Sequence, residues 1–136
     1  MEVVLMVCAQ SAVIDQASNA LSIFNIFQEI NSPAFPFGIA GFTIATLLNL
    51  DEGETEDPTD VRIRINLGEA QIGDFPMVTQ FQGRQSLRSI LFLQGILLPA
   101  PGNLVVSLHH SGRQLASWVV AIRHIGNPAM EATPAA

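Results

Sequence analysis

Apolar and polar residues alternate most clearly in the last third of the chain, over residues 102–123. Every second residue is apolar before Ser111-Gly112 and again after it: Leu104, Val106 and Leu108, then Trp118, Val120 and Ile122. A period of two is typical of half-buried strands, and Ser-Gly between two such runs favours a tight reversal. The pattern therefore predicts one β-hairpin.

The rest of the chain repeats this style in short β-rich runs separated by turn residues. Val3–Ala9 is apolar at every position, which is typical of a strand in the middle of a sheet, and Ala12–Asp15 continues it. Val61–Leu67 alternates cleanly and predicts a half-buried strand. Further strands are predicted at Leu21–Ile30, Phe37–Leu50, Met77–Phe81 and Leu87–Leu98, with breaks at Asn31–Pro36, Gly68–Pro76 and Pro99–Gly102. In Leu21–Ile30 the periodicity also permits a helix, but its Ile and Phe content favours a strand.

About seven to nine strands with regularly spaced turns predict an all-β fold, a single antiparallel β-sandwich, immunoglobulin-like in style, with little helix. A chain of 136 residues suits one domain with an ordinary core. We expect the sandwich over residues 1–125 and a disordered tail over residues 126–136, which hold two prolines and four alanines.

The composition changes this picture, because charged residues are scarce. They make up 13% of the chain, whereas about a quarter is usual for soluble domains. Leu87–Leu98 carries only Arg88 and Leu104–Ile122 only Arg113, so their strands have little to keep them from associating. We expect a homodimer, most simply with two-fold symmetry, or another stable protein partner. The alternative is a core that absorbs these side chains and leaves Ser, Thr, Asn and Gln outside.

The net charge of −6 argues against nucleic acid as a partner, since phosphate binding needs a basic patch. All six basic residues are arginine, which excludes a Schiff-base lysine and a P-loop lysine. Arg62 and Arg64 share one strand face, where they could bind an anion or a partner's carboxylates. The plainer interpretation is that they keep an outward face soluble near the acidic loop.

The start of the chain faintly resembles a secretory signal, but Glu2 is acidic and the apolar run is short. No stretch has the length of a membrane span. We therefore expect a cytoplasmic protein with no membrane contact. The single cysteine, Cys8, lies in the apolar run and is expected to be a buried structural thiol.

Half of the acidic residues lie in the loop Asp51–Asp60. Clustered carboxylates can bind calcium, yet this loop lacks the residue spacing of an EF-hand. A solvated hairpin tip is the preferred interpretation, and a small-molecule or calcium-binding β-sandwich is kept as the alternative.

No catalytic motif is recognisable. His109 and His110 should point to opposite faces of a strand, and His110 could meet His124 only across strands. Ser111 follows His110 at a turn, where serine is common, and no Gly-x-Ser-x-Gly motif is present. We therefore predict no catalytic, metal or cofactor-binding residues and no enzyme, although a hydrolase built from scattered Ser, His and Asp stays open.

Three segments together resemble a family of short bacterial proteins classed only as a domain of unknown function. They are Val7–Asp15, Ala20–Ile30 with Phe35-Pro36, and the hairpin opened by Pro101-Gly102. The chain departs from the family at Gln28, where Asp is frequent, and at Ser111-Gly112, where Asp-Gly is frequent. The resemblance implies a compact, free-standing β-sandwich and assigns no chemistry. The scarce charges, the high apolar content of 49% and the lack of a catalytic motif predict a non-catalytic cytoplasmic module for binding or assembly.

Overall fold

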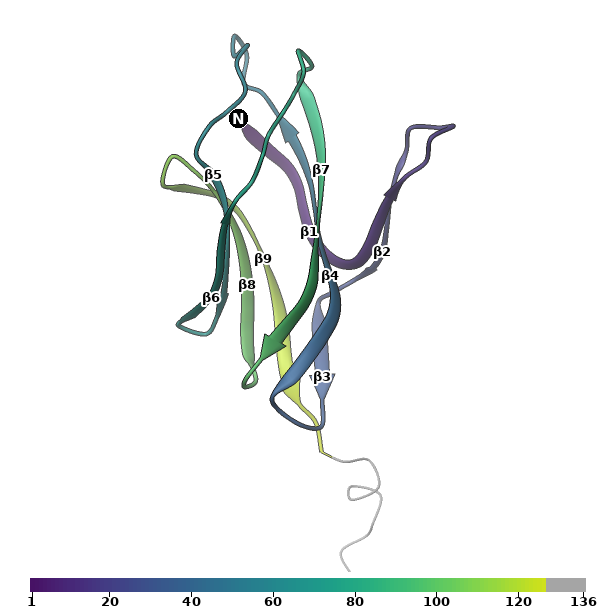
Figure 1. Ribbon diagram of the computed structural model, residues 1–136, viewed down its shortest axis with the longest axis vertical. Coiled ribbons are helices and arrows are strands. Elements are labelled where there is room, and N and C mark those ends of the chain that lie inside the picture. Colours follow the sequence, from purple (N-terminus) through teal and green to yellow (C-terminus); the bar gives the residue numbers. More distant parts are fainter. Residues whose placement is uncertain (127–136) are drawn as a thin grey trace, which may run out of the picture.

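A computed structural model describes residues 1–126, which form nine β-strands and no helix. The strands are β1 (Glu2–Ile14), β2 (Leu21–Ile26), β3 (Glu29–Ser32), β4 (Phe37–Asn49), β5 (Val61–Leu67), β6 (Ala70–Pro76), β7 (Ser86–Leu98), β8 (Gly102–His110) and β9 (Arg113–His124). They form two packed sheets, with the strand orders β2-β1-β4-β7 and β3-β9-β8-β5-β6 (Figure 1). Among these nine strands of residues 1–126, only β3 and β9 pair in parallel. The predicted all-β sandwich is confirmed.

The predicted hairpin at residues 102–123 is confirmed as β8 and β9. Ser111 and Gly112 have positive φ angles of 51° and 79°, the backbone of a type I′ turn that matches the twist of the strands. Strand β8 lies between β5 and β9, so the hairpin sits inside its sheet and not at an edge. The alternating Leu104, Val106 and Leu108 are fully buried there.

The prediction of one strand over Leu21–Ile30 is wrong. The segment divides into β2 and β3, which belong to different sheets. Asn25 adopts a positive φ of 56° near the end of β2. The Trp118 indole N–H then donates to the Phe27 carbonyl at 2.7 Å, which fixes the crossing to the other sheet. Both halves are β-rich, so composition alone did not reveal the break.

The loop predicted at Gly68–Pro76 and the strand predicted at Met77–Phe81 are both wrong, because their roles are exchanged. Gly68, with a φ of 59°, turns the chain from β5 into β6. Strand β6 tolerates Pro76 because it lies at a sheet edge, where a missing N–H costs little. Met77–Phe81 forms a loop whose last residue, Phe81, is buried.

The acidic loop is not a hairpin tip. Strand β4 precedes it and β5 follows it, and these strands lie in different sheets, so Asp51–Asp60 connects the two layers. The loop is also held by contacts with Met1 and Phe81.

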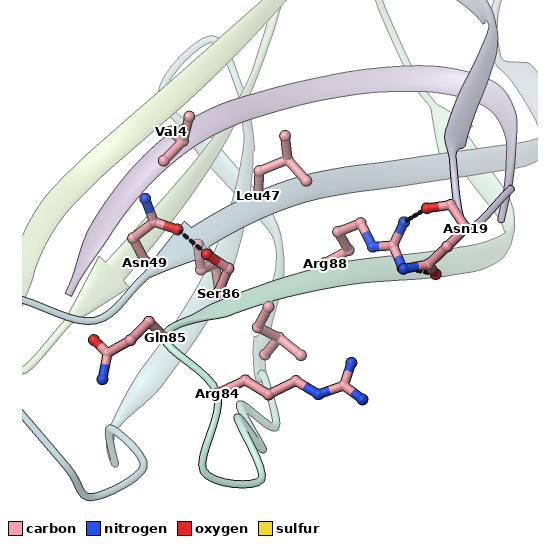
Figure 2. Close-up of a pocket in the computed structure, with 10 residues that line it drawn as sticks. Val4, Asn19, Leu47, Asn49, Arg84, Gln85, Ser86 and Arg88 are labelled. Carbon is pink, nitrogen blue, oxygen red and sulfur yellow. Dashed lines mark hydrogen bonds between the residues drawn. The ribbon is translucent and has the colours of Figure 1, made fainter.

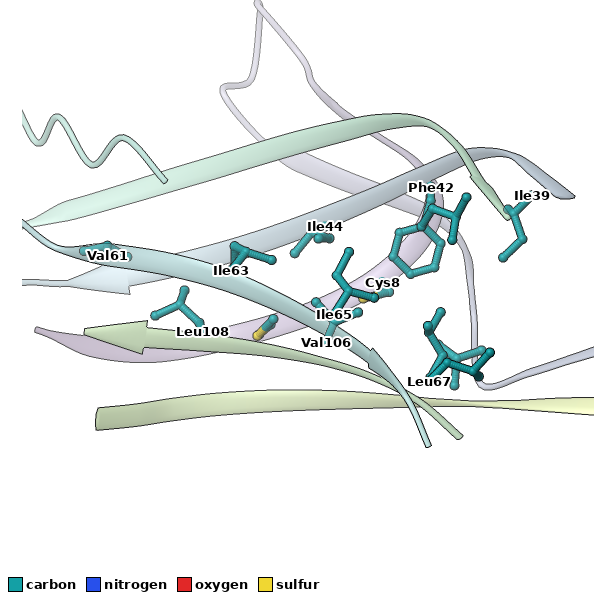
Figure 3. Close-up of a cluster of buried hydrophobic side chains, with 14 of the residues drawn as sticks. Cys8, Ile39, Phe42, Ile44, Val61, Ile63, Ile65, Leu67, Val106 and Leu108 are labelled. Carbon is teal, nitrogen blue, oxygen red and sulfur yellow. The ribbon is translucent and has the colours of Figure 1, made fainter. Parts of the chain in front are cut away.

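The core lies between the two sheets and is built from alternate positions of the strands (Figure 3). Strand β5 shows the pattern most plainly, since Val61, Ile63, Ile65 and Leu67 are buried and the residues between them are not. Facing side chains come mainly from Phe42, Ile44 and Leu48 of β4 and from Met6 and Cys8 of β1. The predicted position of β1 in the middle of a sheet is confirmed, as β1 lies between β2 and β4. The predicted burial holds for Met6–Ala9 and is wrong for Val4 and Leu5, which are exposed.

Within residues 1–126 there is no helix with the length and apolarity that a membrane span requires. The predicted tail, apart from Gly126, lies outside the described residues.

Candidate functional site

The outer face of the four-stranded sheet carries large apolar side chains where water would favour polar ones. Register pairs place Ile90 beside Ala45, Phe92 beside Thr43, and Phe24 beside Ser11 on this face. We call the following set the outer apolar face: Leu5, Val13, Phe24, Ile26, Ile90 and Phe92, each exposed by a third or more. Exposed apolar surface of this kind marks association sites.

The hairpin of β1 and β2 bends away from β4 and β7 towards its tip (Figure 1). The tip of this hairpin is tied to β7 by Arg88. The Arg88 guanidinium donates to Asn19 twice, from Nη2 to Oδ1 at 2.6 Å and from Nη1 to the carbonyl oxygen. The one charge on β7 is therefore used to brace the hairpin across the face.

The residues between the large side chains of the outer apolar face are small or have their polar groups hydrogen-bonded. Val7, Ala9, Thr43 and Ala45 are buried between the larger side chains. The Thr43 hydroxyl donates to the Gln10 carbonyl at 3.1 Å, so burial leaves it paired. Apart from Arg88, the side chains named on this face are consequently uncharged and mostly apolar.

The Phe92 ring lies directly against Gly41 on the neighbouring strand. A Cβ at position 41 would stand 3.2 Å from ring atom Cε2, closer than ordinary packing allows. The absence of a side chain at Gly41 therefore lets the ring lie down on the sheet.

A hollow of about 500 Å³ opens at the end of this sheet where β7 begins (Figure 2). Val4 and Leu47 form an apolar wall, and Arg84 and Arg88 lie along it. The Ser86 hydroxyl donates to Asn49 Oδ1 at 2.7 Å within the same lining. Its size is in the range of small-ligand pockets, and its chemistry suits an apolar group with an anionic end.

A second cluster lies on the outer face of the five-stranded sheet and includes Arg62 and Arg64, which the sequence predicts to share one strand face. Both project from one strand face, as predicted, but both pair with Asp74 on β6 and not with the acidic loop. Arg62 Nε donates to Asp74 Oδ1 at 2.8 Å, and Arg64 Nε lies 3.5 Å from Asp74 Oδ2. The bond from Arg62 is the main reason why the pKa of Asp74 is lowered.

Ser107 and His109 of β8 complete this cluster. Ser107 Oγ lies 2.8 Å from His109 Nε2, the separation of a nucleophile and its general base. Ser107 is only 3% exposed, however, and His109 Nδ1 has no hydrogen-bond partner among residues 1–126. Acyl transfer by such a pair needs an accessible hydroxyl and an oriented imidazole. The arrangement provides neither.

Desolvation, and next the positive charge of Arg64, lower the pKa of His109 below its usual 6.5. The unfolded chain then binds a proton more readily than the folded one, so His109 makes stability rise with pH in the window below 6.5 and saturate above it. We predict that the melting temperature falls more between about pH 7 and about pH 5 in the wild type than in His109→Gln.

The control for this prediction is Ser107→Ala, which removes the hydroxyl and keeps both burial and Arg64. It should lower the melting temperature at every pH while keeping the wild-type slope. Equal slopes for His109→Gln and the wild type would contradict the assigned cause.

The acidic loop is tied to the protein at three of its carboxylates. Asp51 Oδ2 and Glu54 Oε1 each lie 2.7 Å from the amino nitrogen of Met1, and Asp57 Oδ1 accepts the Phe81 N–H at 2.8 Å. The bond from the Met1 amine is the main reason why the pKa of Asp51 is lowered. In the part of the chain that the structure describes, no three His, Cys, Asp or Glu side chains are grouped as metal ligands.

The other residues considered in the sequence lie apart from one another. His110 lies opposite Arg113 in the strand register, beside the hairpin turn. His124 lies at the opposite end of β9, and its ring centre is 6.1 Å from the centre of the Phe35 ring. Ser111 is a turn residue. Cys8 is fully buried, and desolvation raises the pKa of its thiol to about 12, as expected of a structural cysteine.

Residues 4–123 match a family described as a family of unknown function (DUF6941), so the chain belongs to that family. No curated protein matches the chain. The family match confirms the resemblance to a domain of unknown function and assigns no activity.

Sequence reasoning missed the outer apolar face as a defined surface, although it expected exposed apolar area. The face combines residues of β1, β2 and β7, and their adjacency depends on the strand order β2-β1-β4-β7. The mixed apolar character of both faces of Leu21–Ile30 was the available signal. This pattern fits a helix or a strand equally well, so by itself it does not predict a second, exposed apolar face.

Proposed function

We propose that this protein is a non-catalytic binding or assembly module that contacts another protein chain through the outer apolar face. The observation that carries the proposal is the concentration of exposed apolar side chains on one sheet. Phe24 and Phe92 alone are 50% and 55% exposed, and burying such rings is a main source of binding energy at protein interfaces.

The polar cluster on the opposite sheet supports the non-catalytic part of this proposal. Its serine is buried, its histidine lacks an orienting carboxylate bond, and its two arginines share Asp74. These contacts hold strands β5, β6 and β8 together, which is a structural role for residues that otherwise suggest chemistry.

Photocrosslinking in cells tests the binding role. A photoactivatable phenylalanine analogue at position 24 or 92 should yield covalent adducts, either with a second copy or with another protein. The same analogue at Gln114, which is exposed and pairs with His109 on the other sheet, is the matched control and should yield few adducts. Equal or absent adducts at positions 24, 92 and 114 would contradict the proposal.

Small-molecule binding is a second candidate, and the hollow at the start of β7 favours it. Arg84 and Arg88 beside Val4 and Leu47 suit a small amphiphile with a carboxylate or phosphate end. Such a ligand should raise the melting temperature of the wild type and not of Leu47→Arg, which fills the hollow.

The setting we propose for this module is the bacterial cytoplasm. The buried, unpaired Cys8 suits a reducing compartment, and the sequence resemblance is to bacterial proteins. Expression of a tagged copy followed by cell fractionation tests the location.

A further inference from the structure

Strand β7 is an edge strand of thirteen residues with an unprotected side. It pairs with β4 on one side, and no strand of residues 1–126 pairs with the other. It contains no proline and a single charge, Arg88. Edges of soluble monomers are usually blunted by short length, charges, prolines or bulges, and before Gly95 the only such feature of β7 is the charge of Arg88.

The other three edges are blunted. Strand β3 has four residues, and β6 carries Asp74 and Pro76. Strand β2 has six residues and is distorted by the positive φ of Asn25. The open hydrogen-bonding groups are thus concentrated on β7.

One backbone bond shows which groups of β7 are free. The Leu50 N–H donates to the Gln85 carbonyl at 2.8 Å, so the pair 50–85 is hydrogen-bonded. Hydrogen bonding alternates along an antiparallel pair. The backbone N–H and C=O groups of the odd-numbered residues of β7 therefore point to β4, and those of the even-numbered residues point to the free side of the strand. The N–H and C=O groups of Arg88, Ile90, Phe92 and Gln94 therefore point away from the sheet.

We propose that β7 pairs with β7 of a second copy of this chain, antiparallel about a two-fold axis at Leu91. This pairing rests on the proposed binding role and names its partner. Ile90 then lies opposite the partner's Phe92, and Arg88 opposite the partner's Gln94. Four hydrogen-bonded residue pairs give about eight backbone bonds, within the usual range of about ten for a stable interface.

Charge favours a second copy in this orientation. The two Arg88 side chains stand six residues apart along the strands, about 20 Å, which exceeds the screening length of about 8 Å in physiological salt. The acidic loop adjoins the start of β7 through the Leu50–Gln85 bond. An antiparallel pair places the two acidic loops at opposite ends, so the chains of net charge −6 meet where they carry little charge.

Apolar burial favours the same arrangement. Along β7, the side chains of Ile90 and Phe92 lie on the outer face of the sheet and are exposed. The side chains of Leu87, Leu91 and Leu93 lie on the inner face and are only half-buried. Pairing would place the partner's side chains beside both sets and would join the two outer apolar faces into one surface. It would also turn two four-stranded sheets into a continuous eight-stranded sheet.

Light scattering at micromolar concentration tests the pairing with three variants. The wild type should have twice the chain mass of 14.6 kDa. Ile90→Pro removes an N–H that faces outward, so it should keep the fold by circular dichroism and halve the mass. Ile90→Val keeps that N–H and should remain dimeric. If Ile90→Pro misfolds, Ile90→Lys replaces it, with the same expected halving of mass.

A cysteine at the two-fold axis tests the register. In Leu91→Cys the two thiols would face each other across a non-hydrogen-bonded pair, at a Cα separation that a disulfide spans. Cys8 is fully buried, so oxidation should give a disulfide dimer from Leu91→Cys and none from Ile26→Cys on the other edge. A wild-type mass of 14.6 kDa at all concentrations, or a dimeric Ile90→Pro, would overturn the pairing. Adducts at positions 24 and 92 with a foreign protein would then still support the binding role.

Discussion

Replacing Phe42 by alanine is expected to lower the free energy of unfolding by about 4 kcal/mol, in the range of large-to-small changes in a packed core. Phe42 is fully buried on the inner face of β4, and its ring stacks on Phe27 with centres 5.5 Å apart. Alanine would remove most of the side chain and leave a cavity between the two sheets. Urea unfolding followed by circular dichroism measures the loss.

Phe42→Leu is the control for this substitution, since it keeps most of the apolar volume and should cost about 1–2 kcal/mol. A loss below about 1 kcal/mol for Phe42→Ala would show that the two sheets do not pack on this ring.

Replacing Phe81 by alanine is expected to cost about 3 kcal/mol, although Phe81 lies in a loop. Its side chain is buried, and its N–H donates to Asp57 of the acidic loop. The Thr79 hydroxyl donates to the Pro58 carbonyl at 2.9 Å and joins the same two loops. Loss of the ring would therefore loosen both connections at this end of the sandwich.

Val78→Ala is the matched control, because Val78 lies in the same loop and is 74% exposed. Its effect should stay within about 0.5 kcal/mol, as is usual for surface sites. Equal losses at positions 78 and 81 would contradict the assignment of Phe81 to the core.

The parts of the fold that the sequence predicts correctly are those in which local pattern and tertiary environment agree. In Val61–Leu67 the strict alternation of apolar and polar residues matches a strand with one buried face and one face towards solvent. At Ser111-Gly112 the turn residues stand between two strands that pair directly, so the local signal is sufficient.

The failures have a different physical origin. Whether Leu21–Ile30 continues or divides depends on contacts with Trp118, ninety-one residues from Phe27, and no local pattern records them. Strand β6 contains Gly73 and Pro76, which disfavour strands, and it forms because β5 offers a pairing edge. Residues Met77–Phe81, for which the sequence predicts a strand, instead form a loop that ends in the buried Phe81.

The candidate sites are harder to predict from the sequence than the strands, because they depend more strongly on tertiary structure. The sequence shows that Arg62 and Arg64 share a face, but only the register of β5 with β6 and β8 brings Asp74, Ser107 and His109 to them. Likewise, the sequence shows that Leu87–Leu98 has little charge. It does not show that this strand lies at a sheet edge. The low charge matters there, because an uncharged edge can pair with another chain.

Amide hydrogen exchange along β7 tests the central claim most directly, that this chain associates through its free edge. Odd-numbered amides such as Ser89 and Leu91 bond to β4 and should be protected in any state. If β7 pairs with a second copy, the amides of Arg88, Ile90, Phe92 and Gln94 should be protected to a similar degree at micromolar concentration and lose protection on dilution. Rapid exchange at these four positions beside slow exchange at the odd-numbered ones, at every concentration, would contradict the account.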